Sequence, residues 1–141
     1  MKKILILILL LFVTTPVFAA QWLELFEKKY IDIESIDVNE NYKIVKFWTK
    51  NLRKDPKEKF PNYMGKMTDY WYSMNRWNID CINQKSRIET YTVYDLKQNI
   101  IYSDNNVDWN PIIPETYADG YYRVFCMVDF KENPLINPTQ P

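Results

Sequence analysis

Apolar and polar residues alternate along much of this chain, which is the pattern of β-strands that bury one face. The alternating segments are 22–27 (WLELFE), 41–51 (NYKIVKFWTKN), 68–81 (TDYWYSMNRWNIDC), 86–95 (SRIETYTVYD) and 100–104 (IIYSD). Segment 41–51 carries apolar residues on both faces, so we expect it near the centre of a sheet. Gly65 and Gly120 are the only glycines, so the turns must use Asn, Asp and Pro.

Two further segments lie between these strands. Residues 30–32 (YID) predict a short strand that ends in a turn. Residues 52–66 hold two prolines and dense charge, so we expect a long loop there. Together with the alternating segments, this pattern predicts an antiparallel meander sheet of about six strands.

The period of the apolar positions changes near Pro114. The apolar residues Ile113, Tyr117, Tyr121, Phe125 and Val128 recur every three or four residues, as on one face of a helix. Pro114 and Glu115 suit the first turn of such a helix. A strand over 121–128 is the alternative, and the periodicity favours the helix. The predicted fold class is therefore α+β, mainly β, with a C-terminal helix.

The start of the chain has the features of a secretory signal peptide. Two lysines precede an apolar run over residues 4–13, and Val17 and Ala19 occupy the −3 and −1 positions of a cleavage site. The run is about half of the ~20 residues that a membrane-spanning helix needs; a retained N-terminal anchor is the alternative. The predicted organisation is a signal peptide over 1–19, a single domain over 20–128 and a Pro-rich flexible tail over 129–141.

Export bears on the two cysteines, Cys81 and Cys126. An even number of cysteines in an oxidising compartment predicts one disulfide, which would tie the helix to the sheet. The closed loop of about 46 residues would stabilise the fold by roughly 4 kcal/mol in the chain-entropy model. Two buried free thiols are the alternative. No cysteine lies near the cleavage site, so we expect no lipid anchor, and the mature protein should be periplasmic or secreted.

Charge excludes one class of partner. Removal of residues 1–19 takes away two of the 18 Lys plus Arg residues and none of the 18 Asp plus Glu residues, which leaves a net charge of −2. This near-balance gives no basic field, so we expect no nucleic-acid partner. A local basic run holds Lys50, Arg53, Lys54 and Lys57. Two interpretations of this run remain: it is a solvated loop, or it contacts an anionic partner.

The sequence lacks the residue types that the common catalytic and cofactor sites require. The chain has no histidine, which removes Ser-His-Asp and Cys-His arrangements and His-containing zinc sites. Phosphate-binding glycine loops are missing as well, so we expect no cofactor. Asp104, Asn106, Asp108 and Glu115 match ligand positions of an EF-hand calcium loop, but Trp109 stands where that loop requires glycine. We therefore expect an Asx-rich turn and no metal site.

Aromatic residues are in excess, and segment 68–81 carries them on both faces. Tyr70, Tyr72 and Met74 share one parity, and Trp71, Trp77, Ile79 and Cys81 share the other. The second set must face the helix because Cys81 has to reach Cys126. The first set is then an exposed apolar patch, and such patches mark contact sites. Tyr70, Tyr72 and Met74, with the basic run, are our candidate binding residues.

The order of short motifs resembles the surface-adhesin protein E family of secreted bacterial proteins. The matching motifs are YIDIESI (30–36), KIVKFW (43–48), NIDC (78–81), IIYSD (100–104), IIPET (112–116) and the closing Cys126. The resemblance covers residues 22–126. It implies an antiparallel sheet with a C-terminal helix tied back by a disulfide, and adhesion to host extracellular proteins.

These observations lead to two hypotheses for function. The first is a non-enzymatic, adhesin-like module of the cell envelope that binds a protein, such as a host extracellular protein or a second copy of itself. The second is a periplasmic protein that binds a small ligand in an aromatic pocket. A hydrolase built on a carboxylate pair such as Asp32 and Glu34 is a third, weaker reading, because solvated strand-end charges explain that pair equally well.

Overall fold

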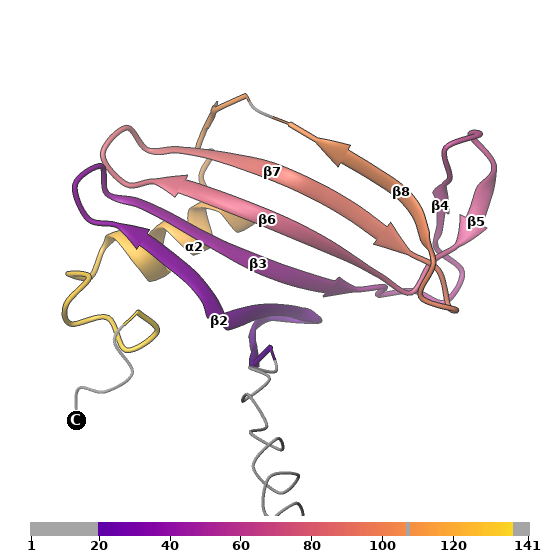
Figure 1. Cartoon of the computed structure of the whole chain (residues 1–141), viewed down its shortest axis with the longest axis horizontal. Coiled ribbons are helices and arrows are strands. Elements are labelled where there is room, and N and C mark those ends of the chain that lie inside the picture. The colour runs from indigo at the N-terminus through magenta and orange to yellow at the C-terminus, as the bar shows by residue number, and fades with distance from the viewer. Residues whose placement is uncertain (1–19, 107, 137–141) are drawn as a thin grey trace, which may run out of the picture.

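The structure, a computed structural model, describes residues 20–106 and 108–136 (Figure 1). The strands are β1 (Trp22–Phe26), β2 (Lys29–Asn39), β3 (Ile44–Leu52), β4 (Lys59–Pro61), β5 (Met67–Asp69), β6 (Tyr72–Asp80), β7 (Lys85–Tyr94), β8 (Ile100–Asn105) and β9 (Asn110–Pro111), and the helix is α2 (Tyr117–Cys126). The predicted signal peptide, 1–19, lies outside the described residues. Within them, no helix is long and apolar enough to cross a bilayer.

Seven strands form one antiparallel sheet in the order β1-β2-β3-β6-β7-β8, and β9 pairs with β7. From β1 to β8, neighbours in the sheet are neighbours along the chain, apart from the insertion of β4 and β5, so the predicted meander is confirmed. Strands β3 and β6 lie at the centre, as expected for segment 41–51. Phe47 of β3 stands opposite Trp77 of β6.

The predicted turn after residues 30–32 is wrong, because β2 continues through it. The register of β2 against β3 shifts between Asp32 and Asp37. Ser35 bridges this irregular stretch: its hydroxyl donates to the Asp32 carbonyl at 2.6 Å and accepts from the Trp48 amide at 2.9 Å. A bulge of this kind bends a strand without ending it. It also interrupts the alternation of apolar and polar residues after Asp32, which is why the sequence predicted a turn there.

The predicted long loop over 52–66 is also wrong in part, because it contains half of a hairpin. Strands β4 and β5 pair through three residues each, which is too short for alternation to reveal. Phe60 of β4 anchors the hairpin on the sheet. Its ring centre lies 5.9 Å from that of Tyr91 and 5.5 Å from that of Tyr102.

The helical interpretation of the C-terminal stripe is confirmed. Thr116 is the N-cap of α2, and its hydroxyl accepts from the Asp119 amide at 3.3 Å. Asp119 also pairs with Arg123 one turn later, at 3.1 Å. The helix thus begins beyond Pro114, which does not occupy its first turn as expected. Since the cap satisfies an amide that the first turn leaves unpaired, the start of α2 is set by Thr116.

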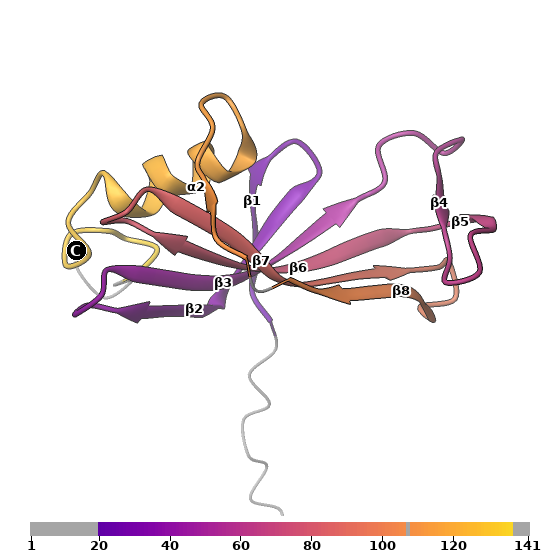
Figure 2. The same cartoon turned by 90° about the horizontal axis from the view of Figure 1, so that it is seen from above.

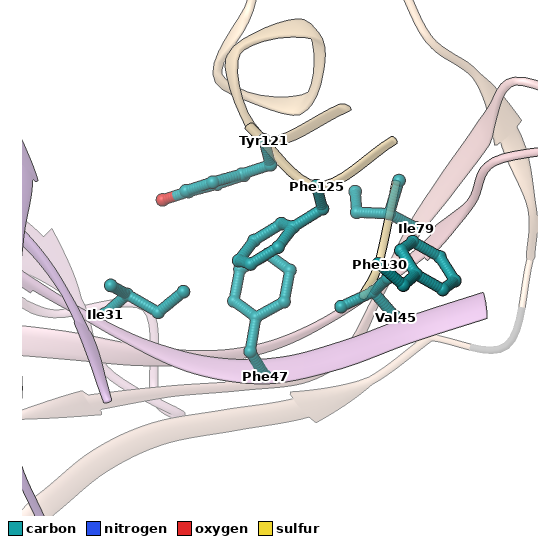
Figure 3. Close-up of a cluster of buried hydrophobic side chains, with 7 residues drawn as sticks. All are labelled: Ile31, Val45, Phe47, Ile79, Tyr121, Phe125 and Phe130. Carbon is teal, nitrogen blue, oxygen red and sulfur yellow. The ribbon is translucent and has the colours of Figure 1, made fainter. Parts of the chain in front are cut away.

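One face of α2 packs on the sheet and forms the core (Figure 3). Tyr121 and Phe125 point from the helix onto Phe47 of β3, whose ring centre lies 5.0 Å and 4.8 Å from theirs. Around this stack lie Ile31, Val45, Ile79 and Phe130, all buried. Burying one such side chain contributes about 1.5–3 kcal/mol, so this cluster is the main source of stability.

Gly120 allows the turn between β1 and β2 to approach α2. A Cβ at this position would lie 2.6 Å from Cζ of Phe26. The Phe26 ring also packs on Tyr121, at 5.4 Å between ring centres, and on Tyr117, at 5.6 Å. Glycine in a helix costs about 1 kcal/mol relative to alanine, and here it makes room for an aromatic ring.

The predicted disulfide is confirmed. Cys81 follows β6, Cys126 ends α2, and their Cα atoms are 5.3 Å apart. The bond fastens the C-terminal end of the helix to the end of the central strand β6. Packing then continues past residue 128, because Phe130 is buried in the core and the Asn133 amide donates to the Val124 carbonyl at 2.7 Å.

The sheet has one covered and one uncovered side. Figure 2 shows α2, the β1–β2 turn and the β4–β5 hairpin on the same side, which we call the helix-side face. No helix or hairpin of the described residues covers the other side, which we call the outer face. Side chains of β3 and β6 alternate between these two faces.

Candidate functional site

The residues predicted to form one binding patch lie on both faces of the sheet. Tyr72 and Met74 are on the outer face, opposite Leu52 and Lys50 of β3. Tyr70 is not with them: its ring packs on Phe60 of the hairpin, at 6.0 Å, on the helix-side face. The expectation that these three residues share a face is therefore wrong.

Trp71 is misplaced by the same reasoning. It lies beside Tyr72 on the outer face, with 5.4 Å between ring centres, and it is 40% exposed. The alternation over segment 68–81 predicts that Trp71 faces the helix. Residues 70 and 71 precede β6, which begins at Tyr72, so the strict alternation of a strand does not extend to them.

Lys50 lies at the centre of an aromatic cluster on the outer face. Its Nζ is 4.5 Å from the ring centre of Tyr72, 5.7 Å from that of Trp71 and 5.9 Å from that of Trp22. Tyr72 stacks in turn on Tyr94 at 4.7 Å. We call these five residues the Lys50 cluster. Exposed cation–π contacts contribute about 0.5–1 kcal/mol each, and the Lys50 ammonium forms no salt bridge within the described residues.

A second cation lies on the same face. The guanidinium of Arg76 is 5.8 Å from the ring centre of Trp48, and its Nε is 3.2 Å from a carboxylate oxygen of Glu89. Trp, Tyr and Arg are the residue types enriched at the energetic centres of protein interfaces. The outer face therefore has the composition of a protein-binding surface.

The basic run does not form one patch. Lys50 belongs to the outer face, whereas Arg53 pairs with Asp69 at 3.6 Å near the hairpin. Lys54 pairs with Glu27 of the β1–β2 turn at 3.2 Å, and Lys57 is exposed in the loop before β4. Arg53, Lys54 and Lys57 are therefore separated from Lys50 and from one another, because β3 ends at Leu52 and the chain turns away from the sheet.

A polar cavity of about 310 Å³ lies on the helix-side face, in the half of the sheet beyond α2. Its floor includes Ser73 and Asn75 of β6 and Tyr91 of β7, and its walls include Lys29, Tyr117 and Tyr70. The Asn51 amide donates to the Ser73 hydroxyl at 3.3 Å. We call this space the polar cavity.

Burial sets the ionisation of the groups around the polar cavity. Burial raises the pKa of the Tyr70 hydroxyl far above its usual value, and a hydrogen bond with Glu58 adds to the effect. Burial also raises the pKa of the Tyr91 hydroxyl. The pKa of the Lys29 ammonium is lowered, first by burial and then by the nearby charge of Lys54. Both tyrosines therefore stay neutral donors at physiological pH.

Sequence reasoning missed Trp22, Lys29 and Asn75. Trp22 reaches Lys50 only because β1 and β3 flank β2 in the sheet, and no local pattern reveals such a contact. Asn75 had a signal: an amide at a position whose neighbours Trp77 and Ile79 were assigned to the core. An amide predicted to be buried indicates a polar partner close to it.

The acidic residues of the described ranges make local hydrogen bonds. No group of three or more Cys, Asp or Glu side chains suited to hold a metal ion occurs in the described ranges. Asp32 accepts hydrogen bonds from the amides of Gln21 and Glu34, at 3.1 Å and 3.2 Å. Its carboxylate therefore serves the local backbone.

Known proteins share this fold. The family model of surface-adhesin protein E matches residues 22–127. The crystal structure of protein E from non-typeable Haemophilus influenzae aligns with a TM-score of 0.51 at 16% identity, over 80% of this chain and 81% of that chain. Crystal form II of Haemophilus influenzae protein E aligns with a TM-score of 0.50 at 17% identity, over 80% and 94% of the two chains. No curated protein matches the chain.

Proposed function

Because this chain belongs to the surface-adhesin protein E family, we propose that it is an exported, non-enzymatic binding protein of the cell envelope that attaches to a protein partner. The observation that carries this proposal is the Lys50 cluster on the uncovered outer face. The Cys81–Cys126 disulfide fits an oxidising compartment, either the periplasm or the exterior.

The partner that fits the outer face is an extracellular host protein with an acidic side chain next to an apolar one. The Lys50 ammonium is held by rings of Trp22, Trp71 and Tyr72, and a carboxylate could join it without breaking an existing ion pair. Desolvation by the partner strengthens both the cation–π contacts and the new ion pair. Amphipathic aromatic rings then supply the apolar contact area.

Surface plasmon resonance tests this proposal with purified residues 20–141 over a panel of immobilised extracellular matrix and serum proteins. We expect saturable binding to at least one of them, weaker at high salt because an ion pair contributes. Lys50→Glu reverses the central charge and should weaken that binding at least tenfold. Tyr72→Ser should weaken it to a similar degree.

Lys131→Glu is the matched control, because Lys131 is exposed and lies far along the chain from the cluster. It makes the same change in net charge and should leave binding unaltered. Equal losses in Lys50→Glu and Lys131→Glu would assign the effect to net charge and reject the site. Sedimentation of the wild type and Lys50→Glu distinguishes a host partner from a second copy of this chain on the same face.

A further inference from the structure

The floor of the polar cavity contains an amide group without a partner. Asn75 is 6% exposed, and its Oδ1 is buried and accepts no hydrogen bond from any described residue. Buried polar groups are almost always paired, because burying an unpaired one destabilises the folded protein. Half a turn of the amide about its last bond would bring this oxygen to the cavity, where a molecule that donates a hydrogen bond would satisfy it.

The wall of the cavity next to α2 carries an unbalanced positive charge. The Lys29 Nζ lies 4.1 Å from the ring centre of Tyr117, and no salt bridge reaches it within 20–106 and 108–136. The other two charged groups of the lining already have partners: Lys54 pairs with Glu27 outside the cavity, and Glu58 bonds to Tyr70 of the cavity wall. An anion next to Lys29 would offset both its burial and the repulsion from Lys54.

The remaining lining combines flat apolar rings with hydroxyl groups. Tyr70, Tyr91 and Tyr117 present aromatic rings, and Ser73 adds a hydroxyl to the floor. The volume of about 310 Å³ falls at the lower end of the range for small-molecule sites, roughly 300–1,000 Å³. This mixture suits a small ring with apolar faces and polar edges.

We propose that the polar cavity binds a sugar ring that bears a carboxylate. The carboxylate pairs with the Lys29 ammonium, a ring hydroxyl donates to Asn75 Oδ1, and the tyrosine rings pack on the faces of the sugar. The site lies on the helix-side face, whereas the Lys50 cluster lies on the outer face. The two sites are therefore independent, and each can fail without the other.

Isothermal titration calorimetry with residues 20–141 tests the ligand class. The probes are galacturonic acid and N-acetylneuraminic acid, and galactose is the neutral counterpart of the first. We expect saturable binding of at least one acidic sugar and binding of galactose at least tenfold weaker. No saturable binding of either acid, or equal binding of galactose and galacturonic acid, overturns the proposal.

Two variants locate the site. Lys29→Gln removes the charge at similar length and should weaken binding of the acidic sugar at least tenfold, with little change in binding of galactose. Asn75→Leu removes the unpaired amide at similar volume; it should abolish binding while the melting temperature stays equal or rises, because no internal hydrogen bond is lost. Lys46→Gln, on the outer face of β3, is the control and should bind as the wild type does.

The two variants also identify failure. If both Lys29→Gln and Asn75→Leu retain wild-type affinity, the sugar binds elsewhere and the proposal is rejected. A free monosaccharide and the terminal residue of a protein-linked glycan share this chemistry. Binding to a sialylated glycoprotein that is lost after sialidase treatment and in Lys29→Gln supports the proposal with the glycan as source. Binding to the free sugar alone supports it with the monosaccharide as source.

Discussion

The helix-side face of the sheet has two halves that are buried to a similar extent but differ in polarity. Under α2, strands β3 and β6 contribute Val45, Phe47 and Ile79, which are at most 1% exposed. Toward the hairpin, the same strands contribute Thr49, Ser73 and Asn75, which are at most 7% exposed. The change from apolar to polar occurs between directly paired positions, Phe47 with Trp77 and Thr49 with Asn75.

This contrast matches the two roles that we propose for the halves, stability for the apolar half and ligand binding for the polar half. The apolar half meets a helix that fills the space above it, whereas the polar half meets a cavity and an unpaired amide. Replacing Asn75 by an apolar residue of similar volume would stabilise the fold, since an unpaired buried acceptor costs about 1–3 kcal/mol. Natural proteins keep such costs where activity needs them, which is the pattern expected of a ligand site beside a structural core.

The largest expected effect comes from truncating the apolar half. Phe125→Ala should lower the free energy of unfolding by about 3–5 kcal/mol, because it leaves a void against Phe47. Ser73→Ala in the polar half is the matched truncation and should cost no more than about 1 kcal/mol. Urea unfolding followed by tryptophan fluorescence measures both. Similar losses in the two variants would contradict the contrast between the halves.

The next effect concerns the bond that holds α2 over the apolar half. A Cys81→Ser, Cys126→Ser double variant should lose about 2–5 kcal/mol of stability, as is typical for small exported domains. Native mass spectrometry should also show that neither thiol of the wild type reacts with an alkylating agent before reduction. Unchanged sugar binding in the double variant at low temperature would show that the polar half stays folded on its own.

The smallest effect is a pH dependence that differs between the halves. Burial raises the pKa of the Tyr121 hydroxyl in the apolar half and of the Tyr70 hydroxyl in the polar half. The contribution of each neutral tyrosine to the free energy of unfolding is fully present below the unfolded pKa of about 10. It is lost as pH rises above that value, by at most about 1.4 kcal/mol per pH unit for each tyrosine.

Phenylalanine variants separate the two contributions. Tyr121→Phe should flatten the alkaline loss of stability more than Tyr70→Phe does, because Tyr121 is only 2% exposed and solvent screens Tyr70 better. Chemical unfolding between pH 8 and pH 11 measures the slopes, and an equal slope in wild type and Tyr121→Phe would reject the assignment.

The sequence by itself determined the elements whose cause is local. Alternation placed the main strands, the apolar period placed α2, and the presence of two cysteines allowed only one intramolecular disulfide. The strands and the helix could be predicted because the periodicity of each element depends on residues close in sequence. The disulfide could be predicted because two cysteines allow one pairing. The order of motifs also pointed to the family.

Only the tertiary structure decided where the candidate binding residues lie. Tyr70 and Trp71 exchanged faces because they precede β6, and Trp22 joined Lys50 because β2 separates their strands by one position. Asn75 and Thr49 are buried because segments distant along the chain pack over that half of the sheet, among them Lys29 and Tyr117 at the polar cavity that Asn75 lines. Burial and charge pairing depend on residues distant along the chain, so no local pattern contains them.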